Sequence, residues 1–191
     1  MPAPKILVIP GSLRTGSHNV RLAALAAKEL ALAGAEVTRI SLQDYTLPLF
    51  DADLVTASGL PAAAVKLKQM LMAHQGVFIT SPEYSASVTP LLKNMIDWIS
   101  RVRERGEPGY AAFKGRVFAI GSATAGGGGG LRSIQILELG CGALVIPEQV
   151  GVPRAEQAFD DTDNLRDETL AAALKASVAR LVELANVMSR A

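Results

Sequence analysis

Short apolar runs alternate along this chain with segments of helical spacing, and this alternation limits the fold more than any other feature. Strands are expected over residues 5–10, 36–41, 76–81, 116–122 and 143–146, with 150–152 extending the last. Helices are expected over residues 19–33, 61–73, 90–101, 131–139 and 164–190, and an irregular connection over 42–59. Helical crossovers cover both faces of a parallel sheet. The pattern predicts one α/β domain over residues 1–191, a five-stranded parallel sheet between two helical layers.

Length and composition exclude several classes of protein. A chain of 191 residues, 49% hydrophobic and 19% charged, can bury a sizeable core and does not have a disordered composition. The net charge of +1, with no basic stretch that interleaves aromatics, argues against nucleic-acid partners. No apolar run approaches the length of a membrane span, and the first one is too short for a signal peptide, so no membrane partner is expected.

Cysteine and histidine are too scarce for several kinds of site. Cys141 is the only cysteine, which excludes an intrachain disulfide and fits a reducing compartment, so a cytoplasmic location is expected. The chain has only two histidines, His18 and His74, too few with Cys141 for a zinc site. We expect Cys141 to be a small buried residue, His74 to lie at the surface, and Trp98 to belong to the core or to an interface.

Three loops of unusual sequence follow the first, third and fourth expected strands, at residues 11–19, 81–89 and 122–130. In open parallel sheets, ligands bind outside the carboxyl ends of the strands, where the strand order reverses. In the order 2-1-3-4-5 that point lies between strands one and three. We therefore expect the three loops to converge on one ligand site.

The first loop has the properties of a phosphate site. It reads Gly11-Ser12-Leu13-Arg14-Thr15-Gly16-Ser17-His18-Asn19. A strand end followed by a helix N-terminus gathers backbone N–H groups around one point, and Arg14 adds a full positive charge there. The loop matches neither the Walker A sequence nor the dinucleotide glycine pattern. The alternative is an ordinary strand-to-helix turn that Ser17 or Asn19 caps.

The second loop is suited to a flat ligand. It reads Ser81-Pro82-Glu83-Tyr84-Ser85-Ala86-Ser87. Pro82 stiffens the chain, and the residues after it can present backbone amides and the ring of Tyr84. The alternative is a proline turn in which Tyr84 covers the core. Glu83 has no obvious acid–base partner, so we expect a structural or oligomer-contact role for it.

The third loop runs from Ser122 into five consecutive glycines, Gly126–Gly130. Glycine costs backbone entropy on folding, and its missing side chain lets a ligand approach the backbone closely. A flexible surface loop is the alternative. Arg101, Arg103 and Arg105 form a basic tip elsewhere, which is either solvated or receives the 2′-phosphate of NADPH.

Three motifs taken together resemble the NADPH-dependent FMN reductase family, which includes quinone, chromate and azo-dye reductases. They are the first loop, the stretch Pro82-Glu83-Tyr84-Ser85, and Leu92-Lys93-Asn94-Met95-Ile96-Asp97-Trp98. The similarity runs through nearly the whole chain in the right order. It implies a flavodoxin-like three-layer sandwich with sheet order 2-1-3-4-5, a bound FMN, and NADPH or NADH as co-substrate.

The resemblance also implies roles for individual residues. Those that would hold the FMN phosphate are Ser12, Arg14, Ser17, His18 and Asn19. Those that would meet or border the flavin ring are Pro82, Glu83, Tyr84, Ser85, Ser122, Gly126 and Gly127. The chain departs from its relatives at residues 85–87, where they often carry Asn and a glycine or tyrosine, and in the long glycine run. Both departures lie near the ring and bear on the acceptor.

The expected function is therefore an FMN-dependent NAD(P)H oxidoreductase that passes hydride to a quinone, an azo compound, a metal oxyanion or free flavin. Because both substrates would use one open side of the flavin, ping-pong kinetics are expected. A flavodoxin-type electron carrier or a non-enzymatic FMN-binding regulatory protein are the alternatives. The helix over 90–101 is apolar on more than one face, and relatives form dimers or tetramers, so a homodimer or homotetramer is expected.

Overall fold

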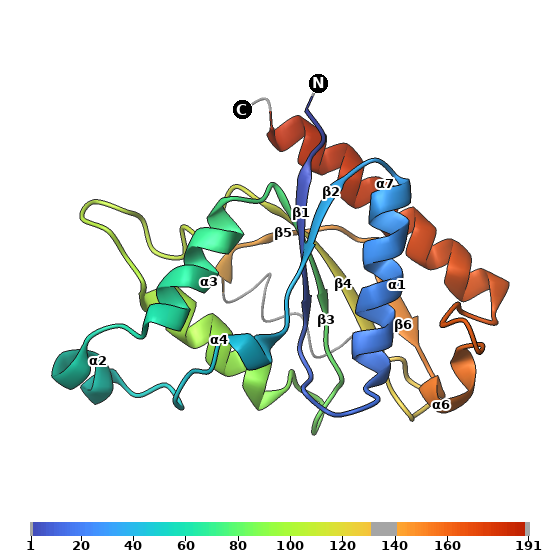
Figure 1. The fold of residues 1–191 in the computed structure, drawn as a ribbon, viewed down its shortest axis with the longest axis horizontal. Coiled ribbons are helices and arrows are strands. Elements are labelled where there is room, and N and C mark those ends of the chain that lie inside the picture. The colour runs from blue at the N-terminus through green and yellow to red at the C-terminus, as the bar shows by residue number, and fades with distance from the viewer. Residues whose placement is uncertain (1, 131–140, 190–191) are drawn as a thin grey trace.

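The computed structural model describes residues 2–130 and 141–189 and has a parallel sheet between two layers of helices (Figure 1). In chain order the elements are β1 (Lys5–Pro10), α1 (His18–Leu32), β2 (Glu36–Arg39), the 3-10 helix η1 (Leu42–Asp44), α2 (Ala52–Ser58), α3 (Ala62–Met72), β3 (Gly76–Thr80), α4 (Pro90–Arg101), β4 (Val117–Ala123), β5 (Leu144–Val145), β6 (Val150–Val152), α6 (Ala155–Ala158) and α7 (Glu168–Met188).

The sheet has the expected order, β2-β1-β3-β4-β5, with every pair parallel. Pro10 pairs with Thr80, and Thr80 pairs with Gly121. The carboxyl ends of β1, β3 and β4 are therefore level with one another, and the three loops leave the sheet at the same edge. The flavodoxin-like fold is confirmed.

The described residues form six strands rather than the five expected, because the last expected strand is broken. β5 pairs with the beginning of β4, and β6 pairs with its end. The N–H of Ile146 still donates to the carbonyl of Phe118 at 2.9 Å, but Pro147 follows and has no N–H to continue the ladder.

The core lies on the two faces of the sheet, and alternation along β1 divides its side chains between them. Ile6 and Val8 pack with the cluster under α1 and α7, whereas Leu7 and Ile9 pack with the cluster under α3 and α4 (Figure 1). All four side chains are fully buried, as expected for a sheet covered on both sides.

Trp98 belongs to the core, the first of the two roles expected for it. Its ring is fully buried, and its indole N–H donates to the carbonyl of Pro48 at 2.7 Å. Of the other apolar residues of α4, Leu92, Met95, Ile96 and Ile99 are also buried within the chain, whereas Leu91 is half-buried. The apolar surface that the sequence suggested is therefore limited to the start of the helix around Leu91.

Polar side chains explain where the helix boundaries differ from expectation. α7 begins at Glu168 because the carboxylate of Asp167 accepts from the N–H groups of Thr169 and Leu170. The expected irregular connection contains η1 and α2, the latter capped by Asp51. The helix expected over 131–139 lies outside the described residues. Within the described ranges, no helix has the length and apolarity to cross a membrane.

Candidate functional site

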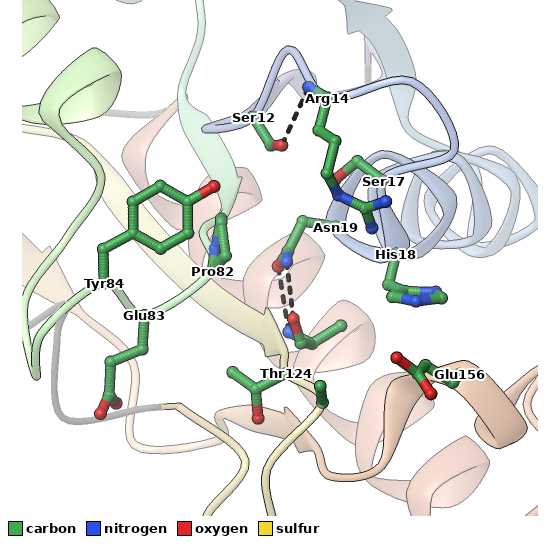
Figure 2. A pocket seen from close by; sticks show the side chains of 12 residues that line it. Ser12, Arg14, Ser17, His18, Asn19, Pro82, Glu83, Tyr84, Thr124 and Glu156 are labelled. Carbon is green, nitrogen blue, oxygen red and sulfur yellow. Dashed lines mark hydrogen bonds between the residues drawn. The ribbon is translucent and has the colours of Figure 1, made fainter.

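A pocket of about 360 Å³ opens at the edge where the three loops leave the sheet (Figure 2). Its size falls in the range of small-molecule sites. The residues that line it are Ser12, Arg14, Ser17, His18, Asn19, Pro82, Glu83, Tyr84, Ala123, Thr124, Ala125 and Glu156. The structure thus brings together residues of the first and second loops that the sequence assigned to one ligand site.

The N-terminus of α1 contributes hydrogen-bond donors to the pocket. Ser17 is the N-cap residue, yet its side chain makes no capping hydrogen bond, although only 3% of its surface is exposed. The first turn of α1 contains no acidic residue. The Ser17 hydroxyl and the first N–H groups of α1 are therefore available to an anion, which the helix dipole also favours.

Arg14 supplies the positive charge at this end of the pocket. Its guanidinium lies over its own loop, 3.4 Å from the carbonyl oxygen of Thr15 and 3.3 Å from that of Gly16. Its backbone N–H donates to the Ser12 hydroxyl at 3.3 Å, which shapes the turn (Figure 2). No ion pair of Arg14 is found among the described residues, so its charge remains free for a ligand.

His18 lies beside Arg14, and the carboxylate of Glu156 lies close to the His18 ring (Figure 2). Its ring stacks on Phe159 with 6.3 Å between centroids, and its Nδ1 is buried with no partner among the described groups. Burial, helped by the positive charges of Arg14 and Arg21, lowers the pKa of His18, and Glu156 opposes this shift. A bound dianion, like Glu156, would raise the pKa of His18.

Asn19 lines the pocket, but its side-chain amide is engaged elsewhere. The Nδ2 group donates to the carbonyl of Ala123 at 2.7 Å, and the N–H of Ala123 donates to Oδ1 at 3.0 Å (Figure 2). Only 2% of Asn19 is exposed. These contacts differ from the phosphate-ligand role expected from the resemblance.

The second loop is a tight turn. Tyr84 and Ser87 exchange two backbone hydrogen bonds, of 2.9 and 3.0 Å. Ser85 and Ala86 form the tip with φ of 51° and 59°. Ser85 is not among the residues that line the pocket. Pro82, Glu83 and the half-exposed ring of Tyr84 are what this loop presents to a ligand (Figure 2).

The third loop meets the pocket between Ser122 and the glycine run, the two places where it was expected to border the ring. Thr124 and Ala125 line it, whereas Gly126 and Gly127 do not and have open space where a side chain would begin. Ser122 also lies outside the lining: it is fully buried, and its hydroxyl has no partner among the described groups.

Sequence reasoning missed four lining residues. Ala123, Thr124 and Ala125 lie between the residues that it did choose, Ser122 and Gly126. Glu156 lies on α6, just beyond the carboxyl end of β6. The rule that flagged the other loops would have found Glu156 if 150–152 had been treated as a strand of its own.

Other chemically active side chains lie away from the pocket. Cys141 is buried, as expected, and burial raises the pKa of its thiol to about 11. His74 is buried rather than at the surface, because its ring packs back on α3 with Nδ1 2.6 Å from the carbonyl oxygen of Met70. Arg101 stacks on Phe50 at the end of α4 farther from the pocket. No cluster of metal-ligating side chains occurs in the part of the chain that the structure describes.

A flavodoxin-like sheet with a pocket at its switch point, lined by Arg14 and the start of α1, is typical of a class of ligand-binding α/β proteins. Within this class, the chain belongs to the NADPH-dependent FMN reductase family, whose sequence model matches residues 4–157.

Two curated relatives illustrate the similarity. An Escherichia coli quinone reductase is 39% identical over 102 residues, 53% of this chain and 53% of its own length, so the match spans about half of that relative. An NAD(P)H-dependent FMN reductase of Pseudomonas aeruginosa is 34% identical over 170 residues, 86% of this chain and 85% of its own.

A solved structure supports the fold. A flavoenzyme NAD(P)H:(acceptor) oxidoreductase from Paracoccus denitrificans superposes with a TM-score of 0.78 at 24% identity, covering 97% of this chain and 99% of its own. At this identity the likeness concerns the fold alone.

Proposed function

We propose that this chain is an oxidoreductase that binds FMN and transfers reducing equivalents from NAD(P)H to a small-molecule acceptor. The observation that carries the proposal is the N-terminus of α1, where a buried, non-capping Ser17 and a free Arg14 charge meet at the switch point of the sheet. Membership of the FMN reductase family supports the same ligand.

The donor set of the pocket fits an FMN phosphate. The groups that would hold it are the Ser12 and Ser17 hydroxyls, Arg14, His18 and the N–H groups of α1, all at one end of the pocket. Pro82 and Tyr84 on one side, and Thr124 and Ala125 on the other, would flank the ring. Glu83 lies on the far side of the pocket from Arg14 (Figure 2). Glu156 lies next to His18 and offsets part of the positive charge at this end, which Arg14 supplies.

FMN held by these residues would supply the redox chemistry, the transfer of two electrons from a nicotinamide to an acceptor. The protein binds and orients it. No Ser-His-Asp or Cys-His arrangement lines the pocket, and the Cys141 thiol is protonated at neutral pH, so no described side chain is assigned a covalent step.

A flavin ring flanked by the second and third loops would leave one side open. NAD(P)H and the acceptor would then use that side in turn, and the kinetics would be ping-pong. Steady-state rates at several concentrations of NADPH and a benzoquinone test this: parallel double-reciprocal lines are expected. Intersecting lines would indicate a ternary complex and overturn the shared-side proposal.

We also propose a homodimer or homotetramer, on a surface that includes the half-buried Leu91 at the start of α4. Leu13 is 49% exposed beside an apolar cavity of about 270 Å³ between η1, its following loop and α4, and Leu49 is 81% exposed. Light scattering at micromolar concentration tests this proposal: a dimer or larger is expected, and a monomer contradicts it.

The lone buried cysteine agrees with a reducing, cytoplasmic setting.

A further inference from the structure

The side-chain amide of Asn19 joins two loops that are far apart in sequence. It donates to the carbonyl of Ala123 and accepts from the N–H of the same residue, at 2.7 and 3.0 Å. Both backbone groups of the last residue of β4 are therefore satisfied by one side chain of α1. Since Asn19 is 98% buried, leaving one of these groups unpaired would be costly.

The backbone of Asn19 extends the same network to the second loop. The Thr80 hydroxyl donates to the Asn19 carbonyl at 2.8 Å, and the Thr80 carbonyl accepts from the N–H of Gly11 at 2.6 Å. The Thr89 hydroxyl donates to the Gly11 carbonyl at 2.8 Å. These groups are buried, and together they tie the carboxyl ends of β1, β3 and β4 to the start of α1.

The position of Asn19 relates the two ends of the pocket. Ser17, in the proposed phosphate site, lies two residues before Asn19 on the same chain segment. Thr124, in the proposed ring site, directly follows Ala123 and is itself fixed by a 3.0 Å hydrogen bond from its N–H to the carbonyl of Val152. The Asn19–Ala123 pair therefore joins the chain segment of the phosphate end directly to that of the ring end.

We infer that Asn19 is a positioning residue, not a phosphate ligand: it holds the third loop at the distance from α1 that a flavin needs. The inference rests on the proposed function for the identity of the ligand. Loss of the Asn19 amide should loosen the link between α1 and the third loop, which its pairing with β6 alone would then hold. The ring contacts should weaken, whereas the donors to the phosphate keep their place on α1.

Comparison of FMN with riboflavin separates the two roles, because riboflavin has the same ring and no phosphate. Both dissociation constants are measured from the change in flavin fluorescence on binding to wild type, Asn19→Ala and Arg14→Gln. Asn19→Ala should weaken both ligands by about tenfold, the loss expected for a buried pair of hydrogen bonds, and leave the ratio of the two constants within twofold of wild type. Arg14→Gln should weaken FMN alone.

Hydrogen exchange in the flavin-free protein gives a second readout. The Ala123 amide should exchange faster in Asn19→Ala, while the Ile79 amide within β3 stays protected. If Asn19→Ala does not fold, Asn19→Asp keeps an acceptor for the Ala123 N–H and removes the donor to its carbonyl. That variant should retain Ala123 protection and still weaken both flavins equally.

Two results would overturn the inference. If the Asn19 variant loses affinity for FMN but not for riboflavin, Asn19 acts on the phosphate. If neither affinity nor Ala123 exchange changes, the bridge does not position the loop. A wild-type protein that binds neither flavin refutes the proposed function itself, and with it the role of Asn19 toward a flavin.

Discussion

Ser17 is the single residue on which the proposed phosphate site depends most. It occupies an N-cap position, where Ser normally accepts a hydrogen bond from the helix it precedes, but makes none. A phosphate oxygen would take the place of that internal contact. It would accept hydrogen bonds from the N–H groups of the helix and from the hydroxyl.

Ser17→Asp tests this site without disturbing the fold. Asp is a good N-cap residue, so α1 should remain intact, but its carboxylate would occupy and repel the phosphate position. We expect FMN affinity to fall by more than about tenfold, about 1.4 kcal/mol, measured by fluorescence titration. Ser17→Ala is the control and should lose less. An FMN affinity within about threefold of wild type, less than 1 kcal/mol, would mean that the phosphate binds elsewhere.

His18 should make the stability of the flavin-free protein depend on pH. Its pKa in the folded state is below the ordinary value of 6.5, so between these two values the unfolded chain binds more protons. The free energy of unfolding should therefore be highest above pH 6.5 and decrease as the pH falls through 6.5 toward the folded pKa.

Urea unfolding of wild type and His18→Gln between about pH 5.5 and 7.5 measures this dependence, a window that spans the ordinary range of histidine. The difference in stability between the two proteins should change with pH, with His18→Gln losing less as the solution is acidified. A constant difference across the window would show that His18 titrates alike in the folded and unfolded chain.

At the scale of elements, the tip of the second loop has an unusual backbone. Ser85 and Ala86 both have positive φ, the conformation of the two-residue turn that normally selects Asn-Gly. Alanine is strained there, since a left-handed conformation costs roughly 1 kcal/mol relative to glycine. Strain of this kind often occurs beside functional sites, and Tyr84 of the pocket begins this turn.

Ala86→Gly should raise the free energy of unfolding by about 1 kcal/mol, because glycine adopts this conformation without strain. Urea denaturation measures it, with Ala31→Gly in α1 as the matched control, which should lose about 1 kcal/mol. Equal destabilisation by both substitutions would show that the turn carries no strain at Ala86.

The elements also show what the sequence could and could not predict. Apolar runs place the strands because each is buried on both faces, and helical crossovers make the sheet parallel. Two boundaries differ from the sequence prediction because a few local hydrogen bonds decide them. Pro147 interrupts the last strand, and the cap provided by Asp167 makes the last helix begin at Glu168. Spacing predicts a second apolar face on α4 that is larger than the one observed, because it does not reveal how much of a helix the rest of the chain covers.

Residues of the candidate site that directly follow a strand could be predicted from the sequence. Contacts that tertiary structure creates could not. Ser12, Arg14 and Ser17 follow β1 directly, so the switch-point rule located them. The two bonds of Asn19 to Ala123 join residues 104 positions apart, and nothing local distinguishes such a bridge from a ligand contact.

For the whole molecule, we propose that the three loops at one edge of the sheet bind a flavin by its phosphate and leave it open to two substrates in turn. The two faces of the sheet supply rigidity, since both are covered by apolar clusters. A carrier protein of the same fold would bind FMN but would not oxidise NADPH catalytically.

Anaerobic titration of the FMN-loaded protein with NADPH, followed by visible absorbance, tests the proposed function most directly. The account predicts that about one equivalent of NADPH removes the flavin absorbance, and that a benzoquinone added after NADP⁺ has been removed restores it. Protein that retains no FMN, or bound FMN whose absorbance NADPH leaves unchanged, would contradict it.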